Sequence, residues 1–451
     1  MANPHIKDMT TGPVGKTLIL FALPFFLSSL LQNVYNLVDT ALAGHFYGDA
    51  ALAAIGSTTS IFFLITMFAN GLNSGFGIVL SRAFGSHNPD KFKRAAAAMF
   101  ILNLSVNLLL AVVSCLFIGS FLQLLNTPEE IFSDAKGYIT IVLAALPITG
   151  MYNMLSSMLQ SLGNSRTPLL FLAISSCLNI LLDLAFVLLV DLGVAGLALA
   201  TVLAQLCSCI LCFIHILRNY PQLHFSRDHM RYDKVLYKEL ITTGLSMSLM
   251  STIFNLGSIF VQGAVNTLGT YAITAQTAAR KLYSLMNMPQ SCLSVALTTV
   301  VSQNYGAGKY ERCKAAWRME IVFGLITSFT VILITNLFGP MLLKAVSGSS
   351  DPDVLKNAMM FLRFHTSGFP VLTVLMGTRM FMQGVGSKII PIVSSFIELI
   401  GKLVFTFLII PYLGFLGVCI VEPSLWVICM LFLVISFVRV SRSLKEGAST
   451  I

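Results

Sequence analysis

Asp39 ends a row of polar side chains in a long apolar stretch. Gln32, Tyr35 and Asn36 precede it by seven, four and three residues, so the four side chains share one face of a predicted helix. An ionised residue at the middle of a bilayer costs at least about 2.5–3.5 kcal/mol, and such a residue therefore indicates a function. We interpret this face as one side of a cation site.

A second carboxylate lies later in the same half of the chain. Asp183 follows Asn179 by four residues, so their side chains meet on one helical face. Asn153 and Thr201 lie in the apolar runs before and after this pair, where they can join it. These residues and Asp39 form an oxygen-rich set with no basic residue beside the two acids in the sequence.

The oxygen-rich set suits a coupling ion. Burial and the nearness of a second carboxylate both favour the protonated form of an aspartate, so the coupling ion can be a proton. The same carboxylate, amide and hydroxyl oxygens suit sodium, for which Asp39, Asn179 and Asp183 are the predicted ligands. Both ions remain candidates. The structural alternative for Asp39 alone is that it caps a broken helix near the outer membrane surface.

The second half carries a different set of charges. Glu398 and Lys402 are spaced for an i,i+4 ion pair, and Glu422 stands in the last apolar run. Acids and bases are mixed here, since Arg280, Lys281, Arg363 and Arg379 also fall in apolar runs. Charge pairing is the first interpretation. Contact of Glu398 or Glu422 with a cationic substrate is the alternative.

Aromatic and thioether side chains offer a surface for flat, apolar cations. The predicted substrate cavity combines such residues with the polar face and the acids named above. Its members are Gln32, Tyr35, Asn36, Tyr283, Met286, Glu398 and Glu422.

The elements that must position these side chains follow from composition. The chain of 451 residues is 56% hydrophobic and only 10% charged, which predicts a polytopic α-helical membrane protein. The apolar runs long enough to cross a bilayer are 16–40, 51–80, 95–122, 134–158, 168–190, 194–217, 238–265, 271–302, 316–338, 355–380, 389–410 and 415–438. These predict twelve transmembrane helices.

The twelve runs form two repeats of six. Gln160–Pro168 returns as Gln383–Pro391 after 223 residues, and Pro147 is repeated as Pro370 at the same shift. We therefore predict an amino-terminal lobe (1–217), a cytoplasmic linker (218–239) and a carboxy-terminal lobe (240–451), with similar kinks at the two paired prolines. Duplicated membrane units are typical of secondary transporters.

The net charge of +9 does not indicate nucleic acid binding, because the basic residues are segregated. Of the 28 Lys and Arg residues, twenty fall in loops assigned to one side, whereas Lys136, Lys344 and Lys356 fall on the other. The positive-inside rule then places both termini in the cytoplasm. No cleavable signal, resident cofactor or enzyme motif is expected, and a monomer is expected.

Several motifs together resemble a known family. They are Asn33–Gly44 (NVYNLVDTALAG) followed by Leu52–Gly56 (LAAIG), Gln160–Pro168 (QSLGNSRTP), the pair Asn179 and Asp183, and Gly193–Gly196 with Thr201. In these runs the chain resembles the multidrug and toxic compound extrusion (MATE) transporters of the bacterial multidrug-export type, over nearly its whole length.

The resemblance implies a two-lobed, V-shaped bundle of twelve helices in the bacterial plasma membrane. It also implies export of organic cations and drugs in exchange for protons or sodium. The coupling residues it implies are Asp39, Asn153, Asn179, Asp183 and Thr201. The alternative function is a flippase for lipid-linked oligosaccharides, in which Arg280, Lys281, Arg363 and Arg379 would hold a pyrophosphate.

Overall fold

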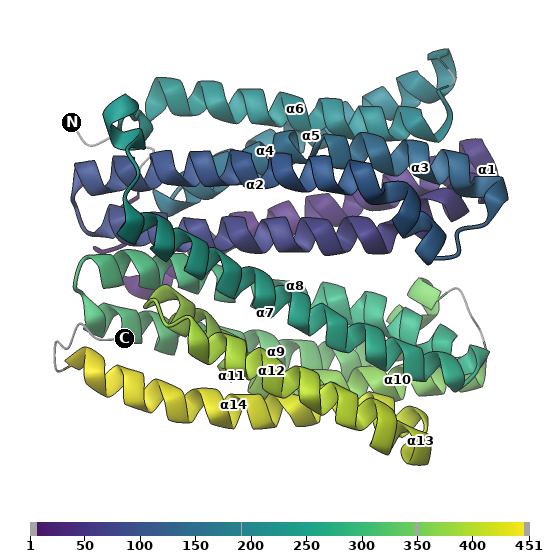
Figure 1. Cartoon of the computed structure of the whole chain (residues 1–451). Coiled ribbons are helices and arrows are strands. Elements are labelled where there is room, and N and C mark those ends of the chain that lie inside the picture. The colour runs from purple at the N-terminus through teal and green to yellow at the C-terminus, as the bar shows by residue number, and fades with distance from the viewer. Residues whose placement is uncertain (1–6, 191, 348–350, 446–451) are drawn as a thin grey trace. The chain divides into compact units, whose positions relative to one another are not determined.

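The computed structural model describes residues 7–190, 192–347 and 351–445, and these are helical with no strand among them (Figure 1). They form two compact units. The first unit holds Leu23–Ser248 and the segment before Met9, and the second holds Met9–Ala22 and the chain from Leu249 onward. The boundaries predicted at 217 and 240 stay predictions.

The first unit is a bundle of long helices. Its helices are the part of α1 (Val14–Gly85) from Leu23 on, α2 (Pro89–Leu124), α3 (Glu129–Ala144), α4 (Leu146–Ser161), α5 (Arg166–Ala185) with the π-helical turn η1 (Phe186–Val190), α6 (Gly193–Asn219), the short 3-10 turns η2 (Pro221–Leu223) and η3 (Arg227–Met230), and the start of α7 (Lys234–Thr267).

The second unit has the same kind of construction. It contains the first residues of α1, the end of α7, α8 (Thr270–Gly306), α9 (Tyr310–Ser347), α10 (Pro352–Ser367), α11 (Phe369–Gly384), α12 (Ile389–Val404) with the π-helical turn η4 (Phe405–Ile409), α13 (Ile410–Leu413) and α14 (Phe415–Lys445).

The helices match the twelve predicted spans. Eight helices in the described chain are long and apolar enough to cross a membrane, and two bent pairs raise that number to ten. Helix α1 is broken at Gly48, where φ is 74°, so it contributes two rods. Counting both rods and adding the more polar α8 gives twelve, and the predicted all-helical membrane fold is confirmed.

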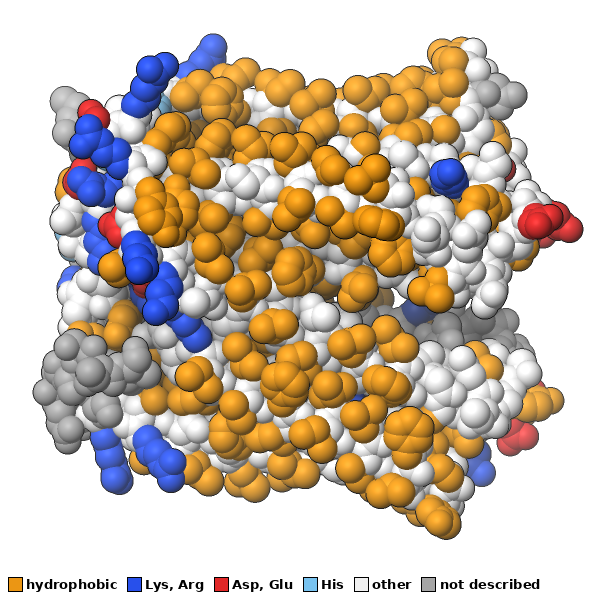
Figure 2. Space-filling view, viewed as in Figure 1, with side chains coloured by type: hydrophobic (Ala, Val, Ile, Leu, Met, Phe, Trp, Pro, Cys, Tyr) orange, Lys and Arg blue, Asp and Glu red, His pale blue; other side chains and the backbone are white. Residues whose placement is uncertain are grey.

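The outer faces of the helices suit lipid. Large apolar side chains in the middle of α2, such as Leu116 at 73% exposure, are open to the surroundings. On the face seen in Figure 2, hydrophobic side chains cover the middle of each unit, and Lys and Arg side chains gather mainly at one end. Exposed apolar area of this extent indicates a membrane surface.

The duplication is visible in the backbone. Gly48, Gly163 and Gly193 have positive φ, and so do Gly269, Gly386 and Gly414, which follow them by 221, 223 and 221 residues. The π-helical turns, Phe186–Val190 and Phe405–Ile409, end shortly before Gly193 and Gly414. Only glycine adopts such conformations at little cost, which explains why these residues recur in both halves.

The predicted kinks at the paired prolines are confirmed. Pro147 stands in the first turn of α4, which bends by 42° from α3, and Pro370 stands in the first turn of α11, which bends by 50° from α10. Proline at the start of a helix needs no amide hydrogen bond, so each bent pair is a broken span.

Candidate functional site

A cavity of about 300 Å³ lies inside the first unit, among α1, α4, α5 and α6. Six of the residues predicted from the sequence line it, namely Gln32, Tyr35, Asn36, Asn153, Asn179 and Thr201. The other lining residues include aromatic and thioether side chains, among them Phe62, Phe63, Met67 and Tyr152. The predicted polar faces therefore meet around one cavity.

The two predicted acids meet in the same unit. Asp183 on α5 is fully buried at 0% exposure, and Asp39 on α1 is partly buried. Their carboxyl groups face each other closely enough to interact electrostatically and to share a hydrogen bond when one of them is protonated. Two carboxylates this close repel each other, so either one of them binds a proton or another cation lies beside them.

The buried oxygens around this pair lack donors. Both carboxylate oxygens of Asp183, Oδ1 of Asp39 and the amide oxygen of Asn179 are buried without a hydrogen-bond partner in the described chain. No Lys, Arg or His forms an ion pair with either aspartate among the described residues. Since buried acceptors are normally satisfied, this cluster is a candidate cation site.

Neighbouring hydrogen bonds orient the amide and hydroxyl groups. The amide of Asn179 donates to Oγ1 of Thr201 at 3.5 Å, and that hydroxyl donates to the Leu197 carbonyl at 3.1 Å. The amide of Asn153 donates to Oδ1 of Asn70 at 2.9 Å. Because the amide nitrogens are engaged with these partners, the Asn179 oxygen is left as an acceptor.

The capping alternative for Asp39 finds no support. Asp39 lies inside a helical rod, nine residues before the break at Gly48. Its carboxyl group interacts with that of Asp183 on another helix.

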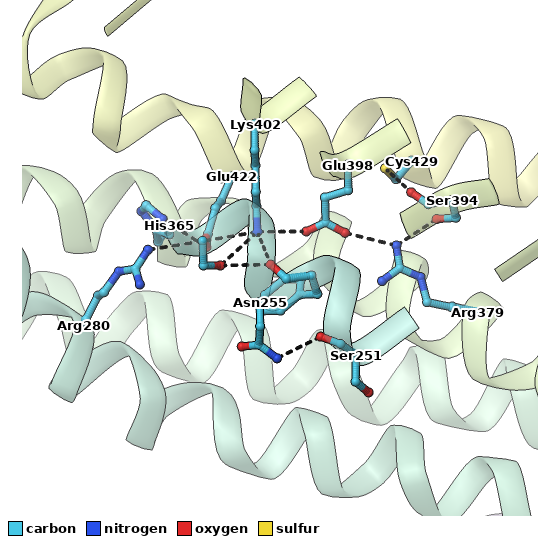
Figure 3. A network of polar contacts seen from close by, with 12 residues as sticks. Ser251, Asn255, Arg280, His365, Arg379, Ser394, Glu398, Lys402, Glu422 and Cys429 are labelled. Carbon is cyan, nitrogen blue, oxygen red and sulfur yellow. Dashed lines mark hydrogen bonds and ion pairs between the residues drawn. The ribbon is translucent and has the colours of Figure 1, made fainter. Parts of the chain in front are cut away.

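The charges of the second unit form one buried network (Figure 3). Glu398 lies 3.5 Å from Lys402 and 3.2 Å from Arg379. Glu422 lies 3.9 Å from Lys402 and 3.8 Å from Arg280. The predicted pairing of Glu398 with Lys402 is confirmed, and charge pairing extends over four helices.

Lys402 is the centre of this network. Its side chain is fully buried and its ammonium group lies over the ring of Phe254, 3.9 Å from the centroid. Nζ also donates to Oγ of Ser258 at 3.2 Å. His365, which sequence reasoning did not include, approaches Glu422 at 3.4 Å through Nε2.

The remaining predicted substrate residues do not line the cavity of the first unit. Tyr283 packs against the rings of His365, Phe369 and Trp426, and Met286 accepts a hydrogen bond from Thr335 at 3.6 Å. Glu398 and Glu422 are held by the ion pairs described above. Substrate contact by these four residues stays a prediction.

One buried acid was missed at the level of sequence. Glu320 on α9 is 0% exposed, and no ion pair reaches it within the described chain. It stands four residues inside the predicted span 316–338. Basic residues of the preceding loop are so near that this position resembled the cytoplasmic end of the span. Its position on the same helical face as apolar Phe323 and Ile334 was the available signal.

Comparison with known proteins agrees with this architecture. The family model described as MatE matches residues 24–185 and again residues 246–408. A probable multidrug resistance protein of Bacillus subtilis, YoeA, is 28% identical over 348 residues that cover 75% of each chain. The probable multidrug resistance protein NorM of Thermotoga maritima is 25% identical over 412 residues, which cover 90% of this chain and 88% of that protein.

A solved structure has the same fold. A MATE protein in the bent conformation superposes with a TM-score of 0.92 at 21% identity, covering 98% of both chains. The duplicated helical halves and the family match identify a multi-pass membrane transporter. The chain belongs to the MatE family of multidrug efflux transporters, as the resemblance of its motifs indicated.

Proposed function

We propose that this protein is a secondary active antiporter that exports organic cations and drugs across the bacterial plasma membrane in exchange for protons or sodium. The coupling ion binds in the first unit at Asp39, Asn179 and Asp183, with Asn153 and Thr201 orienting the site. Neither a resident cofactor nor a partner protein takes part in this scheme.

The observation that carries this proposal is the cluster of four buried acceptor oxygens without donors. A bound proton supplies one hydrogen bond between the carboxyl groups of Asp39 and Asp183. A bound sodium ion is coordinated by the carboxylates together with the Asn179 oxygen. Either cation removes the repulsion that the two acids otherwise exert on each other.

The cavity beside the ion site suits an apolar cation. Its volume of about 300 Å³ is at the lower end of the range for small-molecule sites, so it accommodates one flat ring system or part of a larger drug. Aromatic side chains contact the ring, while Gln32 and Asn36 supply polar contacts. Ion and substrate then compete for one neighbourhood, which is what exchange requires.

The driving force is sufficient. One charge that crosses a potential of 100 mV releases about 2.3 kcal/mol. Export of a neutral drug against a tenfold gradient requires about 1.4 kcal/mol. One coupling ion per neutral drug therefore supports accumulation outside the cell. Exchange of one ion for a singly charged drug is electroneutral and is driven by the concentration gradient of the ion instead.

Proteoliposomes with separately imposed proton and sodium gradients test the proposal and identify the ion. We expect ethidium efflux to depend on one of the two gradients, and Asp39→Asn and Asp183→Asn each to abolish that dependence. Asp134→Asn is the matched control, because Asp134 is an exposed acid of the same unit and loses the same charge. Full gradient-driven efflux by both site variants would exclude this ion site.

The flippase alternative requires cations free to hold a pyrophosphate. Arg379 is 4% exposed and paired with Glu398, and Arg280 is paired with Glu422, which leaves less positive charge for an anionic lipid. Lys281 and Arg363 are exposed. Transbilayer movement of a lipid-linked sugar in the same proteoliposomes, unaffected by the two aspartate variants, would favour the flippase.

A further inference from the structure

Glu320 is a carboxylic acid enclosed on every side by the second unit. It projects from α9, and its side chain is 0% exposed. The hydroxyl of Ser294 on α8 donates to Oε1 at 2.9 Å. The other oxygen, Oε2, is buried and has no hydrogen-bond partner in the described chain.

A glycine on the facing helix makes this enclosure possible. The carboxyl group lies next to Gly377 on α11, where even a methyl group would overlap Oε2. Beside this contact, Nε1 of Trp317 donates to Oγ1 of Thr378 at 3.1 Å, so α9 and α11 are fastened next to Glu320. The packing leaves no room for a hydration shell around an ionised carboxylate.

No ion pair among the described residues compensates a negative charge at this position. Arg379, the only basic residue of α11, is paired with Glu398, and Lys314 on α9 is paired with Glu311. Helix α8 carries no acidic or basic residue between Lys281 and Gly306. Other ionisable groups on the neighbouring elements include Lys16 on α1, Arg312 and Arg318 on α9, His365 on α10 and Arg439 on α14. Within the described chain Glu320 forms no ion pair with any of them.

Burial of an unpaired carboxylate costs several kcal/mol, so the neutral acid is the stable form in such surroundings. A neutral acid needs few hydrogen-bond donors. The hydroxyl of Ser294 supplies one, and the contact with Gly377 leaves no room for water. Sodium does not fit, because one carboxyl and one hydroxyl group supply too few oxygens for it.

We propose that Glu320 is a proton-binding site of the second unit, distinct from the carboxyl pair Asp39 and Asp183 of the first. The bound proton allows α11 to pack on α9, and its loss loosens that contact because the carboxylate then requires water. The proposal rests on the proposed antiporter function only for its role in transport. Proton binding itself is independent of that function.

Infrared spectroscopy of the purified full-length protein tests the site directly. The carbonyl stretching band of a protonated carboxylic acid is expected in the wild type at neutral pH and is lost in Glu320→Gln. Asp183→Asn is expected to retain this band, and Glu311→Gln is the control for an exposed glutamate of the same helix. A spectrum of Glu320→Gln that keeps every protonated carboxyl band of the wild type overturns the proposal.

Two further measurements do not depend on the Glu320→Gln variant. Ser294→Ala removes the hydrogen bond that the described chain donates to the acid and should shift the same band. An unshifted band contradicts the proposal. The chain has two tryptophans, so Trp426→Phe leaves Trp317 as a reporter beside Gly377. Its emission should change as the buffer is made alkaline, and no change up to strongly alkaline pH refutes the link to α9–α11 packing.

These outcomes are separable from the proposed function. Full gradient-driven efflux by both aspartate variants, which would exclude the ion site of the first unit, leaves the infrared result intact, because spectroscopy requires no transport. Loss of the band in Asp183→Asn, with retention in Glu320→Gln, assigns the bound proton to the first unit and overturns the second site.

Discussion

The buried network of the second unit predicts that removing a positive charge is less harmful than removing a negative one. The network has three permanent cations, Arg280, Arg379 and Lys402, against the two carboxylates Glu398 and Glu422. Lys402→Met leaves Arg379 with Glu398 at 3.2 Å and Arg280 with Glu422 at 3.8 Å. Every remaining permanent charge then has a partner.

Glu422→Gln has the opposite effect. It leaves the three cations with Glu398 as the one carboxylate among them, and it removes the carboxylate next to Arg280 and His365. Breaking a buried pair so that a charge is uncompensated costs about 3–5 kcal/mol. Lys402→Met replaces a buried stem by one of similar size, and such exchanges cost less than about 1.5 kcal/mol. We expect Glu422→Gln to be the more destabilising change by about 2–3 kcal/mol.

Thermal unfolding of the purified protein in detergent measures this difference. For units of roughly 150–250 residues each kcal/mol shifts Tm by about 2–4 °C, so the two variants should differ by at least about 4 °C. Glu130→Gln is the surface control, since Glu130 is exposed and forms no ion pair in the described chain, and it should change stability by less than about 0.5 kcal/mol. A Lys402→Met protein as unstable as Glu422→Gln would refute the charge balance.

Two more changes test the first unit. Gly75→Ala should lower stability by about 1–3 kcal/mol in the same thermal assay, because the added carbon would stand 2.5 Å from the Gly244 α-carbon. The control Gly56→Ala has open space around the added carbon and should leave stability unchanged. Equal effects of the two changes would contradict the packing of Gly75 on Gly244. Tyr220→Phe removes the hydrogen bond that Asn164 donates at 2.6 Å and should cost about 1 kcal/mol at neutral pH. Burial raises the pKa of Tyr220, so the neutral phenol stabilises the fold below about pH 10, and this contribution is lost as the pH rises further. The difference between wild type and Tyr220→Phe should therefore shrink in strongly alkaline buffer, and a constant difference would count against this role.

Most of the fold was predictable because bilayer thickness imposes a length on each apolar run. The kinks near Pro147 and Pro370 were predictable for a similar reason, since proline lacks the amide hydrogen that a continuous helix needs. The π-helical turns η1 and η4 were not predicted, because an inserted residue in a helix leaves no change in hydropathy.

The candidate site was predictable in part. Helical spacing placed Gln32, Tyr35 and Asn36 on one face, and the cavity lining agrees with that face. Spacing could not show that Asn179 turns its amide nitrogen toward Thr201, because that depends on packing between helices. Glu320 escaped notice because nearby basic residues made its position resemble a loop, although the helix carries it into the protein interior.

The first helix has a consequence for biosynthesis. Its opening segment belongs to the second unit, where the amide of Met9 donates to the Gln303 side chain, 294 residues further along the chain. Lys309 and Arg312 hold the following residues, Thr10 to Gly12. The segment that leaves the ribosome first therefore obtains its native contacts only after more than two thirds of the protein has been translated. A nascent chain arrested before residue 303 should leave this segment accessible to protease, and completion of α9 should protect it.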